Sequence, residues 1–393
     1  MSDEKAYSEK KKPTAPKLRF KEFKSGWINK KLSDVSVFLD GKRKPIKESD
    51  RAKMRGQFPY YGASGIIDFV NDYIFDDEII LLGEDGENIV SRNLPLAFKV
   101  VGKCWVNNHA HVIKPNRDTD IDFLTHILEK TNYEIYNTGT AQPKLNQEVC
   151  KSIPLNLPTL PEQQKIASFL SEVDEKIQQL TRKKELLEHY KKGVMQQLFS
   201  GKLRFKDENG KAYSKWEEKR LGEVSVITMG QSPDSSSYNS EGKGLPLIQG
   251  NADISERISN PRQWTSEPTK VCDVGDLLLT VRAPVGSISK SIHKACIGRG
   301  VCAIRNNELS DINYLYQVLV DYESKWKRLE QGSTFTAVNG DDIKSIKINV
   351  PSPKEQQKIA SFLTALDAKI EGVATQITHT QTFKKGLLQQ MFV

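Results

Sequence analysis

The feature that most constrains this fold is a segment that occurs twice in the chain. Residues 158–200 align with residues 351–393 without a gap, at a constant offset of 193 positions. Of the 43 aligned positions 19 are identical, including the run EQQKIASFL at 162–170 and 355–363. Chance matching of two unrelated segments gives far fewer identities. The two segments are therefore copies of one structural unit.

Both copies carry apolar residues in steps of four and three, which is the heptad pattern of a coiled coil. In the first copy the helix seam comprises Ile166, Leu170, Val173, Ile177, Leu180 and Leu187. In the second copy it comprises Ile359, Leu363, Leu366, Ile370, Val373 and Ile377. A rise of 1.5 Å per residue makes each helix roughly 57 Å long, more than a core of this size needs. The pattern predicts two long helices that pair and act as a spacer.

A second repeat precedes each helix. The run LRF at 18–20 and Trp27 return as LRF at 203–205 and Trp216. Apolar runs predict strands at 79–82, 98–101, 112–113 and 151–158 and a helix at 121–131, then strands at 277–281, 303–304 and 344–351 and a helix at 312–329. The chain is predicted to comprise a disordered basic tail (1–17), a globular domain (18–158), a central spacer helix (159–200), a second globular domain (201–351) and a C-terminal spacer helix (352–393). The predicted fold class is α+β.

The two helices are expected to pair antiparallel within one chain. A parallel pair would require the chain to travel back along a full helix, and no segment is available for that connection. Antiparallel pairing places one globular domain at each end of the spacer. Two similar but unequal heads suit a double-helical ligand, whose half-sites repeat about every 34 Å.

Composition favours an intracellular protein with a polyanionic partner. The formal net charge is +8 and the sequence pI is about 9.0. No apolar run is long enough for a membrane span, and the lysine-rich start lacks the apolar region of a signal peptide. The five cysteines form no CxxC pair, which favours reduced thiols. We therefore expect a cytoplasmic protein without membrane contact.

These features together resemble a known family, the DNA-specificity subunit of type I restriction-modification systems. The resemblance covers nearly the whole chain. It rests on the repeated EQQKIASFL motif with its long helix, on FPYYGASGIID (58–68), on IFDDEIILLGEDGENI (74–89) and on LPLIQGNADI (245–254).

The resemblance implies that the globular units are two tandem α/β target recognition domains, each reading one half of a split, asymmetric site in double-stranded DNA. The helix pair would set the unread gap and dock two copies of a methyltransferase subunit, joined by motor-nuclease subunits. S-adenosylmethionine, ATP and Mg²⁺ would then belong to those partners. This chain would be a non-catalytic subunit without a cofactor. The alternative is a coiled-coil interaction scaffold that binds no DNA.

Partner helices are expected on the outer faces of the spacer and where its seam is polar, at Lys184, Lys191, Thr380 and Lys384. The second helix also contains Gly372 and four threonines in its latter half, which lowers its helix propensity.

Candidate DNA contacts are polar and basic residues in glycine-containing loops, because such side chains read base edges and phosphates. In the first domain they are Lys42, Arg43, Lys44, Tyr60, Tyr61, Ser64, Thr140, Gln142 and Lys144. In the second they are Gln231, Ser232, Lys243, Gln249, Asn251, Arg282, Ser333 and Thr334. Each has a structural alternative: a basic run can be a solvated turn, a tyrosine can pack in a core, and Arg282 can form a salt bridge.

Catalytic and metal signals are weak. Asp234, Glu241 and Lys243 have the order of a nuclease motif, but the spacing is too short for two strands to share a metal. His109 and His111 would share one strand face near Cys104, yet no fourth ligand or CxxC accompanies them. The sequence contains neither a P-loop nor the Asn/Asp-Pro-Pro-aromatic tetrapeptide of amino-methyltransferases. No metal site and no catalytic residue are expected.

Overall fold

The computed structural model describes residues 15–332 and 338–392, which excludes most of the predicted basic tail. It divides into two compact units. The N-terminal unit comprises Met1–Thr181 with Thr375–Val393, and the C-terminal unit comprises Arg182–Ala374. Each unit therefore contains one globular region together with a part of each long helix.

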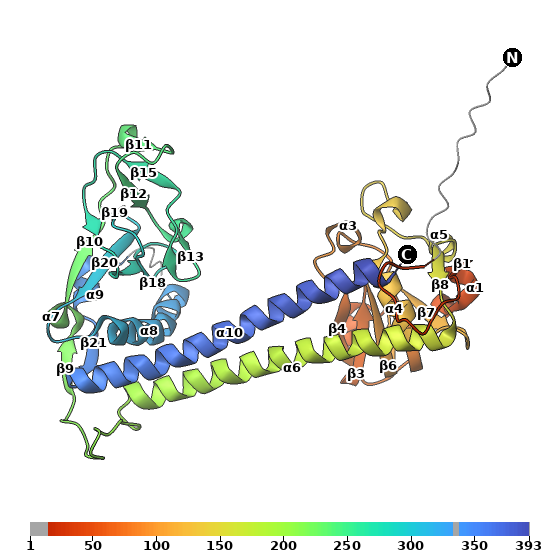
Figure 1. Ribbon diagram of the computed structural model, residues 1–393, viewed down its shortest axis with the longest axis horizontal. Helices are drawn as coiled ribbons and strands as arrows, with labels where there is room; N and C mark the ends of the chain where they lie inside the picture. Colours follow the sequence, from red (N-terminus) through yellow and green to blue (C-terminus); the bar gives the residue numbers. More distant parts are fainter. Residues whose placement is uncertain (1–14, 333–337, 393) are drawn as a thin grey trace. The chain divides into compact units, whose positions relative to one another are not determined.

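The two long helices are α6 (Leu160–Phe199) and α10 (Pro353–Met391), of 40 and 39 residues. In the N-terminal unit the end of α10 packs on the start of α6, and in the C-terminal unit the end of α6 packs on the start of α10 (Figure 1). The helices are therefore antiparallel, and they pair within one chain. α10 continues past Gly372 to Met391, because packing of its end on the N-terminal unit compensates for low local propensity.

The predicted seam residues lie on the packed faces of both helices. Fully or nearly fully buried are Ile166, Leu170, Val173, Leu180, Ile359, Leu363, Leu366 and Val373. Half-buried are Ile177, Leu187, Ile370 and Ile377.

Two of the polar seam positions, Lys191 and Lys384, pair with an aspartate of the opposite helix. Lys384 donates to Asp174 at 2.6 Å in the N-terminal unit, and Lys191 donates to Asp367 at 2.5 Å in the C-terminal unit. The two residue numbers of each pair add to the same total, as one antiparallel register requires. These lysines therefore fix the helix register.

A six-stranded sheet forms the core of the N-terminal globular region, in the order β2-β7-β5-β6-β3-β4. Its strands are β2 (Ser36–Phe38), β3 (Arg55–Gly62), β4 (Gly65–Val70), β5 (Phe75–Gly83), β6 (Ala97–Val106) and β7 (Ala110–Pro115). Helix α4 (Ile121–Lys130) packs on β5 and β6. The predicted strands at 79–82, 98–101 and 112–113 lie within β5, β6 and β7, and the predicted helix corresponds to α4.

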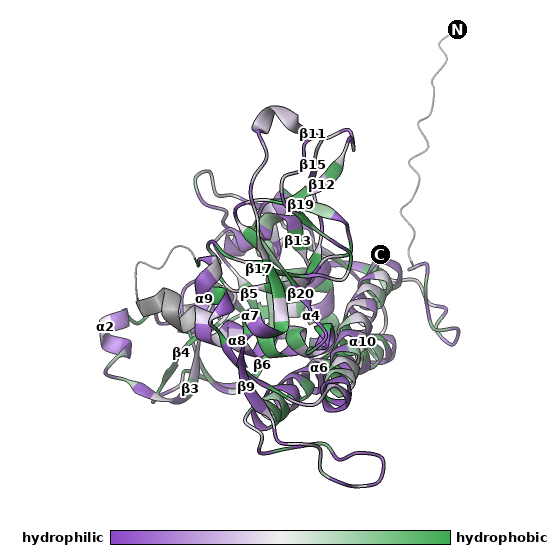
Figure 2. Cartoon of the chain, turned by 90° about the vertical axis from the view of Figure 1, so that its left-hand side faces the viewer, coloured by the Kyte–Doolittle hydropathy of each residue, from purple (hydrophilic) through white to green (hydrophobic). Residues whose placement is uncertain are grey.

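The C-terminal globular region contains two sheets, of order β10-β20-β17-β18-β14-β13 and β11-β15-β12-β19-β16. The strands used below are β10 (Ser225–Met229), β17 (Leu277–Thr280) and β20 (Val301–Asn306). The others are β11 (Tyr238–Asn239), β12 (Leu245–Ile248), β13 (Ile254–Ser255), β14 (Ile258–Ser259), β15 (Gln263–Thr265), β16 (Val271–Cys272), β18 (Ile288–Lys290) and β19 (Ala295–Ile297). Figure 2 shows apolar residues concentrated in the central strands near β17 and β20. Helix α8 (Ile312–Gly332) packs on β18 and β20.

Short elements connect each globular region to its helix. Two-stranded ribbons pair β1 (Ile28–Lys31) with β8 (Pro154–Leu157) and β9 (Glu217–Arg220) with β21 (Lys347–Val350). The short helices are α1 (Leu32–Val35), α2 (Glu48–Arg51), α3 (Asn88–Ser91) and α5 (Gln147–Lys151), then α7 (Leu221–Val224) and α9 (Gly340–Lys344).

A buried glutamate anchors each globular region to the first turn of its long helix. Arg19 binds both carboxylate oxygens of Glu162 at 2.6 and 2.7 Å, and the Trp27 indole donates to the same group at 3.3 Å. In the C-terminal unit Arg204 and Trp216 bind Glu355 in the same way. Both glutamates are at most 1% exposed. The two sequence repeats, LRF with its tryptophan and EQQKIASFL, are therefore the two halves of one contact.

The glutamine after each glutamate completes the junction. Gln163 accepts from the Asp120 amide and donates to the Pro158 carbonyl, and Gln356 makes the same contacts with Asp311 and Pro351. This ties the start of α6 to the segment before α4, and the start of α10 to the segment before α8.

Removing one glutamate should destabilise only its own unit. In the Glu162→Ala variant the Arg19 guanidinium loses its buried partner, which costs about 3 kcal/mol, the lower end of the range because Arg19 is partly exposed. Native-state hydrogen exchange should show a lower opening free energy for β5 to β7, with the C-terminal sheets unchanged. Glu355→Ala should give the reverse pattern. An effect of Glu162→Ala no larger than that of Glu172→Ala, an exposed position on the same helix, would contradict this role.

Candidate functional site

Three loops of the N-terminal unit converge at Glu84, directly after β5. The Glu84 amide donates to the His109 carbonyl at 2.8 Å, and the Leu145 amide donates to the Glu84 carbonyl at 2.7 Å. Residues 40–44, which include the 3-10 turn Asp40–Lys42 after β2, also reach this point. We call residues 40–44, 84–85, 107–110 and 137–146 the loop cluster. It contains six of the predicted DNA-contact residues: Lys42, Arg43, Lys44, Thr140, Gln142 and Lys144.

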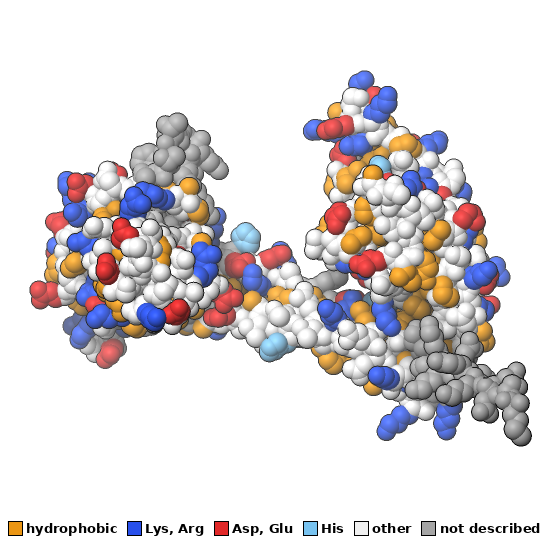
Figure 3. Space-filling view, turned by 90° about the horizontal axis from the view of Figure 1, so that it is seen from above, with side chains coloured by type: hydrophobic (Ala, Val, Ile, Leu, Met, Phe, Trp, Pro, Cys, Tyr) orange, Lys and Arg blue, Asp and Glu red, His pale blue; other side chains and the backbone are white. Residues whose placement is uncertain are grey.

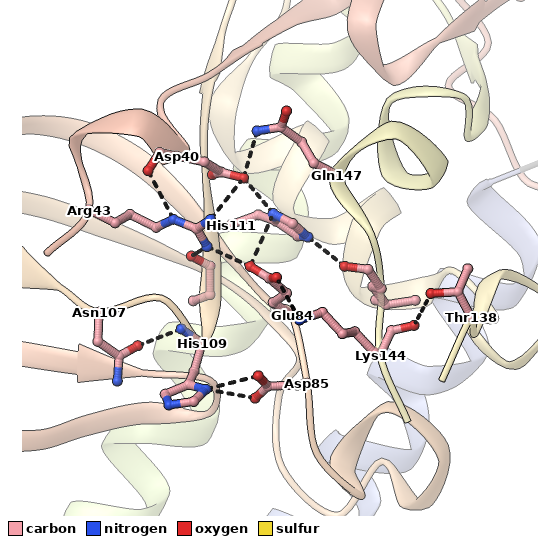
Figure 4. Close-up of polar contacts among 12 residues, drawn as sticks. Asp40, Arg43, Glu84, Asp85, Asn107, His109, His111, Thr138, Lys144 and Gln147 are labelled. Carbon is pink, nitrogen blue, oxygen red and sulfur yellow. Dashed lines mark hydrogen bonds and ion pairs between the residues drawn. The ribbon is translucent and has the colours of Figure 1, made fainter. Parts of the chain in front are cut away.

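Basic side chains of the loop cluster share the Glu84 carboxylate. Arg43 donates to Glu84 Oε2 at 2.6 Å and to the Ala110 carbonyl at 2.8 Å (Figure 4). Lys144 lies 3.4 Å from Glu84 Oε1. Glu84 therefore ties the loop at 40–44 to the loop at 137–146.

A buried ion pair lies beneath these loops. His111 Nδ1 lies 2.6 Å from Asp40 Oδ2, and His111 Nε2 lies 2.8 Å from the Leu145 carbonyl oxygen. A carboxylate and a carbonyl can only accept, so both ring nitrogens must carry a proton. His111 is therefore an imidazolium with two buried hydrogen bonds, although it is only 1% exposed.

The pKa values of the pair agree with this geometry. Burial alone lowers the pKa of His111, but the hydrogen bond with Asp40 and the negative charge of that carboxylate outweigh burial and raise the pKa to about 10. Burial raises the pKa of Asp40, but hydrogen bonds from His111, the Val112 amide and Gln147 outweigh it and hold that pKa below its usual value. The pair is therefore charged on both sides at neutral pH.

His109 does not share a strand face with His111, contrary to the sequence-based expectation. It lies in the turn before β7, where its amide donates to Asn107 Oδ1 and its ring contacts the Asp85 carboxylate. The described part of the chain contains no cluster of three His, Cys, Asp or Glu side chains that could hold a metal ion. The five cysteines are buried free thiols.

The structure corrects one of the predicted contacts in the first domain, Tyr60, and shows an internal partner for a second, Arg43. Tyr60 is 1% exposed and packs with Val70 and Trp105, while its hydroxyl accepts from the Ile46 amide, so it cannot touch DNA from this position. Arg43 is held in the loop cluster, and its charge is neutralised by Glu84.

The remaining candidates of the N-terminal unit stay accessible to different extents. Tyr61 is half-buried against Phe98, and Ser64 is half-buried. Exposed are Lys42, Lys44, Thr140, Gln142 and Lys144.

In the C-terminal unit Arg282 is exposed just after β17. Gln231, Lys243 and Asn251 are also exposed, and Lys243 pairs with Glu241 at 2.6 Å. Ser232 and Gln249 are half-buried. Ser333 and Thr334 lie outside the described residues.

The acidic residues of the nuclease-like run bond locally. Asp234 caps the turn at 235–237 by accepting from the Ser236 amide and hydroxyl, and Glu241 binds Lys243. Sequence reasoning did not nominate Asp40, Glu84 or Gln147, because their partners lie up to 107 positions away in the chain.

The Lys and Arg side chains of both globular regions are interspersed with acidic ones on the face seen in Figure 3. No helix of the described residues has the length and apolar character needed to cross a membrane.

Comparison with known proteins identifies the family to which this chain belongs. The model of the type I restriction modification DNA specificity domain matches residues 24–189 and 213–379. The chain belongs to this specificity family. Each of the two matched segments contains one globular region together with most of its long helix.

Relatives named as specificity subunits support the assignment. The MjaX protein of Methanocaldococcus jannaschii, described as a type I restriction enzyme specificity subunit, is 38% identical over 274 residues. The match covers 67% of this chain and 64% of the MjaX protein, so this chain spans slightly less than two thirds of that relative's length. The type I restriction enzyme specificity subunit S.HindORF215P of Haemophilus influenzae is 29% identical over 380 residues and covers 90% of this chain and 91% of its own. A solved structure concerned with complex assembly and conformational transition of the type I R-M system matches with a TM-score of 0.61 and 25% identity, over 94% of this chain and 98% of its own.

The His111–Asp40 pair should make the stability of the N-terminal unit depend on pH. Since the pKa of His111 is raised in the folded state, its contribution is fully present below about 6.5, the pKa of an unfolded histidine, and is lost as pH rises toward about 10. The difference in melting temperature between the wild-type chain and the His111→Ala variant should therefore be largest near pH 6 and shrink by about pH 10. A difference that stays constant over this range would contradict the charged pair.

Proposed function

We propose that this chain is the DNA-recognition subunit of a type I restriction-modification complex. Each globular region would read one half of a split, asymmetric site in double-stranded DNA. One observation carries the proposal. The two regions share the same backbone hydrogen bonds around the central strand, but the side chains near these bonds differ. Leu145 donates to the Glu84 carbonyl in one region, and Val338 donates to the Val281 carbonyl at the same place in the other.

The exposed side chains near these backbone bonds differ between the two regions and would suit two different DNA half-sequences. The N-terminal region offers Thr140, Gln142 and Lys144, and the C-terminal region offers Arg282 after its central strand. Arginine and glutamine read guanine and adenine through paired hydrogen bonds. The net charge of +8 supports contact with phosphates, which supply most of the affinity but no sequence information.

The helix pair would set the unread gap and carry the partners. Large apolar side chains remain exposed on the long helices, at Leu186, Tyr190 and Phe383. We assign these faces to two copies of a methyltransferase subunit, which motor-nuclease subunits would join. Methyl transfer from S-adenosylmethionine and ATP- and Mg²⁺-dependent steps belong to those partners, and this chain is non-catalytic. The chain would act in the cytoplasm, on the DNA there.

Shortening the spacer by one heptad in both helices should shorten the gap. Deleting residues 178–184 together with 374–380 removes matching stretches and keeps both lysine–aspartate pairs. Seven residues span about 10 Å, or roughly 3 bp. Methylation mapping of a host with the methyltransferase partner should show the same half-sequences at a shorter distance. Altered half-sequences with an unchanged gap would contradict the ruler role, and a deletion in α6 alone should disrupt the register and serve as the control.

Replacing Arg282 by Ala should weaken discrimination at one base of one half-sequence, by about 1–3 kcal/mol if the guanidinium binds a guanine. Lys42→Ala should instead weaken binding of all sequences and reduce the salt dependence. Binding of the chain with its methyltransferase partner to a randomised duplex library, at several salt concentrations, separates the two effects. Binding without any sequence preference would favour the scaffold alternative.

A further inference from the structure

The two globular regions form the same backbone bond, Leu145 to Glu84 in one and Val338 to Val281 in the other, over opposite kinds of interior. In both, the strand before the loop pairs in the same register: Phe38 opposes Ile113 in β2–β7, and Ile227 opposes Ile304 in β10–β20. This equivalence aligns Asp40 with Met229, His111 with Cys302, Glu84 with Val281 and Gln147 with Gly340. A charged network in one region therefore corresponds to an apolar cluster in the other.

The apolar version is closely packed. Cys302 is fully buried and Val281 is 3% exposed. A Cβ atom added at Gly340 would lie 3.2 Å from Cγ of Met229, so a glutamine at this position would displace the methionine. In the C-terminal region Val338 is therefore held by apolar packing and by its backbone bond to Val281.

The charged version uses four ionised groups beneath the loops. Asp40 accepts from His111, from the Val112 amide and from Gln147 Nε2 at 2.7 Å. Arg43 and Glu84 add a second pair beside the first, and Glu84 Oε2 lies 3.8 Å from His111 Nδ1 (Figure 4). Lys144 also faces Glu84, and Cys150 of α5 faces His111.

Such a network is not required for the fold, because the second region of the same chain dispenses with it. Burying ions carries a desolvation cost that apolar packing avoids, and what ions add is directional geometry. Here the direction is specific: His111 Nε2 donates to the Leu145 carbonyl, at the end of the loop at 137–146. The same loop carries the exposed Thr140, Gln142 and Lys144.

We propose that His111, held by Asp40, is a positioning residue for the loop at 137–146. The half-sequence read by the N-terminal region then depends on this buried ion pair, whereas the half-sequence read by the C-terminal region does not. The effect on the loop stands on the geometry alone, and the effect on DNA reading rests on the proposed function.

The test replaces the ionic interior with the chain's own apolar one. The Asp40→Met/His111→Cys/Gln147→Gly variant copies three positions of the second region and keeps the Arg43–Glu84 pair. It leaves no unpaired buried charge, so it is expected to fold even if His111→Cys alone does not. Cys302→Ala is the matched control at the equivalent position. Hydrogen exchange of residues 137–146, measured on the full chain without DNA, should accelerate on the order of tenfold in the triple variant, as expected for one lost charged hydrogen bond. The control should leave this exchange unchanged.

The same variants are then mapped for methylation in a host with the methyltransferase partner. The triple variant should relax one half-sequence and leave the other half-sequence and the gap unaltered. Unchanged exchange of residues 137–146 would overturn the positioning role, whatever the DNA result. Faster exchange with both half-sequences intact would overturn the role in reading while leaving DNA recognition by the chain in place.

Discussion

The structure depends on one interaction made twice, a fully buried glutamate at the first turn of each long helix. Glu162 and Glu355 each bind an arginine and a tryptophan that lie at the start of the globular region in sequence but contact the helix that follows it. A buried carboxylate has few alternatives to such a partner, so the junction is fixed in one arrangement. This contact therefore orients each globular region relative to the start of its own long helix.

The two globular regions share the strand register and backbone bonds but differ in their interior side chains. The strand register recurs in both regions, and so does a backbone bond to the residue near the end of the central strand, Glu84 in one and Val281 in the other. The interior differs, with Asp40 and His111 in one region and Met229 and Cys302 in the other. Such a chain can alter the interior of one region without altering the strand register, the helix or the other region, which suits the proposed reading of an asymmetric site.

The sequence predicted the elements that depend on local pattern. The repeat and its heptads predicted α6, α10 and their antiparallel pairing, and apolar runs predicted the central strands and α4. It failed where burial is decided by distant partners. Tyr60 lies in a polar, glycine-containing segment, yet the pairing of its strand buries the side chain in a hydrophobic cluster. The His111–Asp40 pair joins residues 71 positions apart, and the Glu162–Arg19 pair joins residues 143 apart. The repetition of both halves of the glutamate contact was a visible signal, but spacing alone does not show that they touch.

If the proposed function holds, the chain recognises two separate half-sequences at a fixed distance. The most direct measurement is genome-wide mapping of methylated bases, by long-read sequencing, in a host that carries this chain and a type I methyltransferase, with the same host lacking this chain as reference. We expect one new asymmetric motif with two specified halves and an unspecified gap of constant length. A contiguous motif, a gap of variable length, or methylation that does not depend on this chain would contradict it.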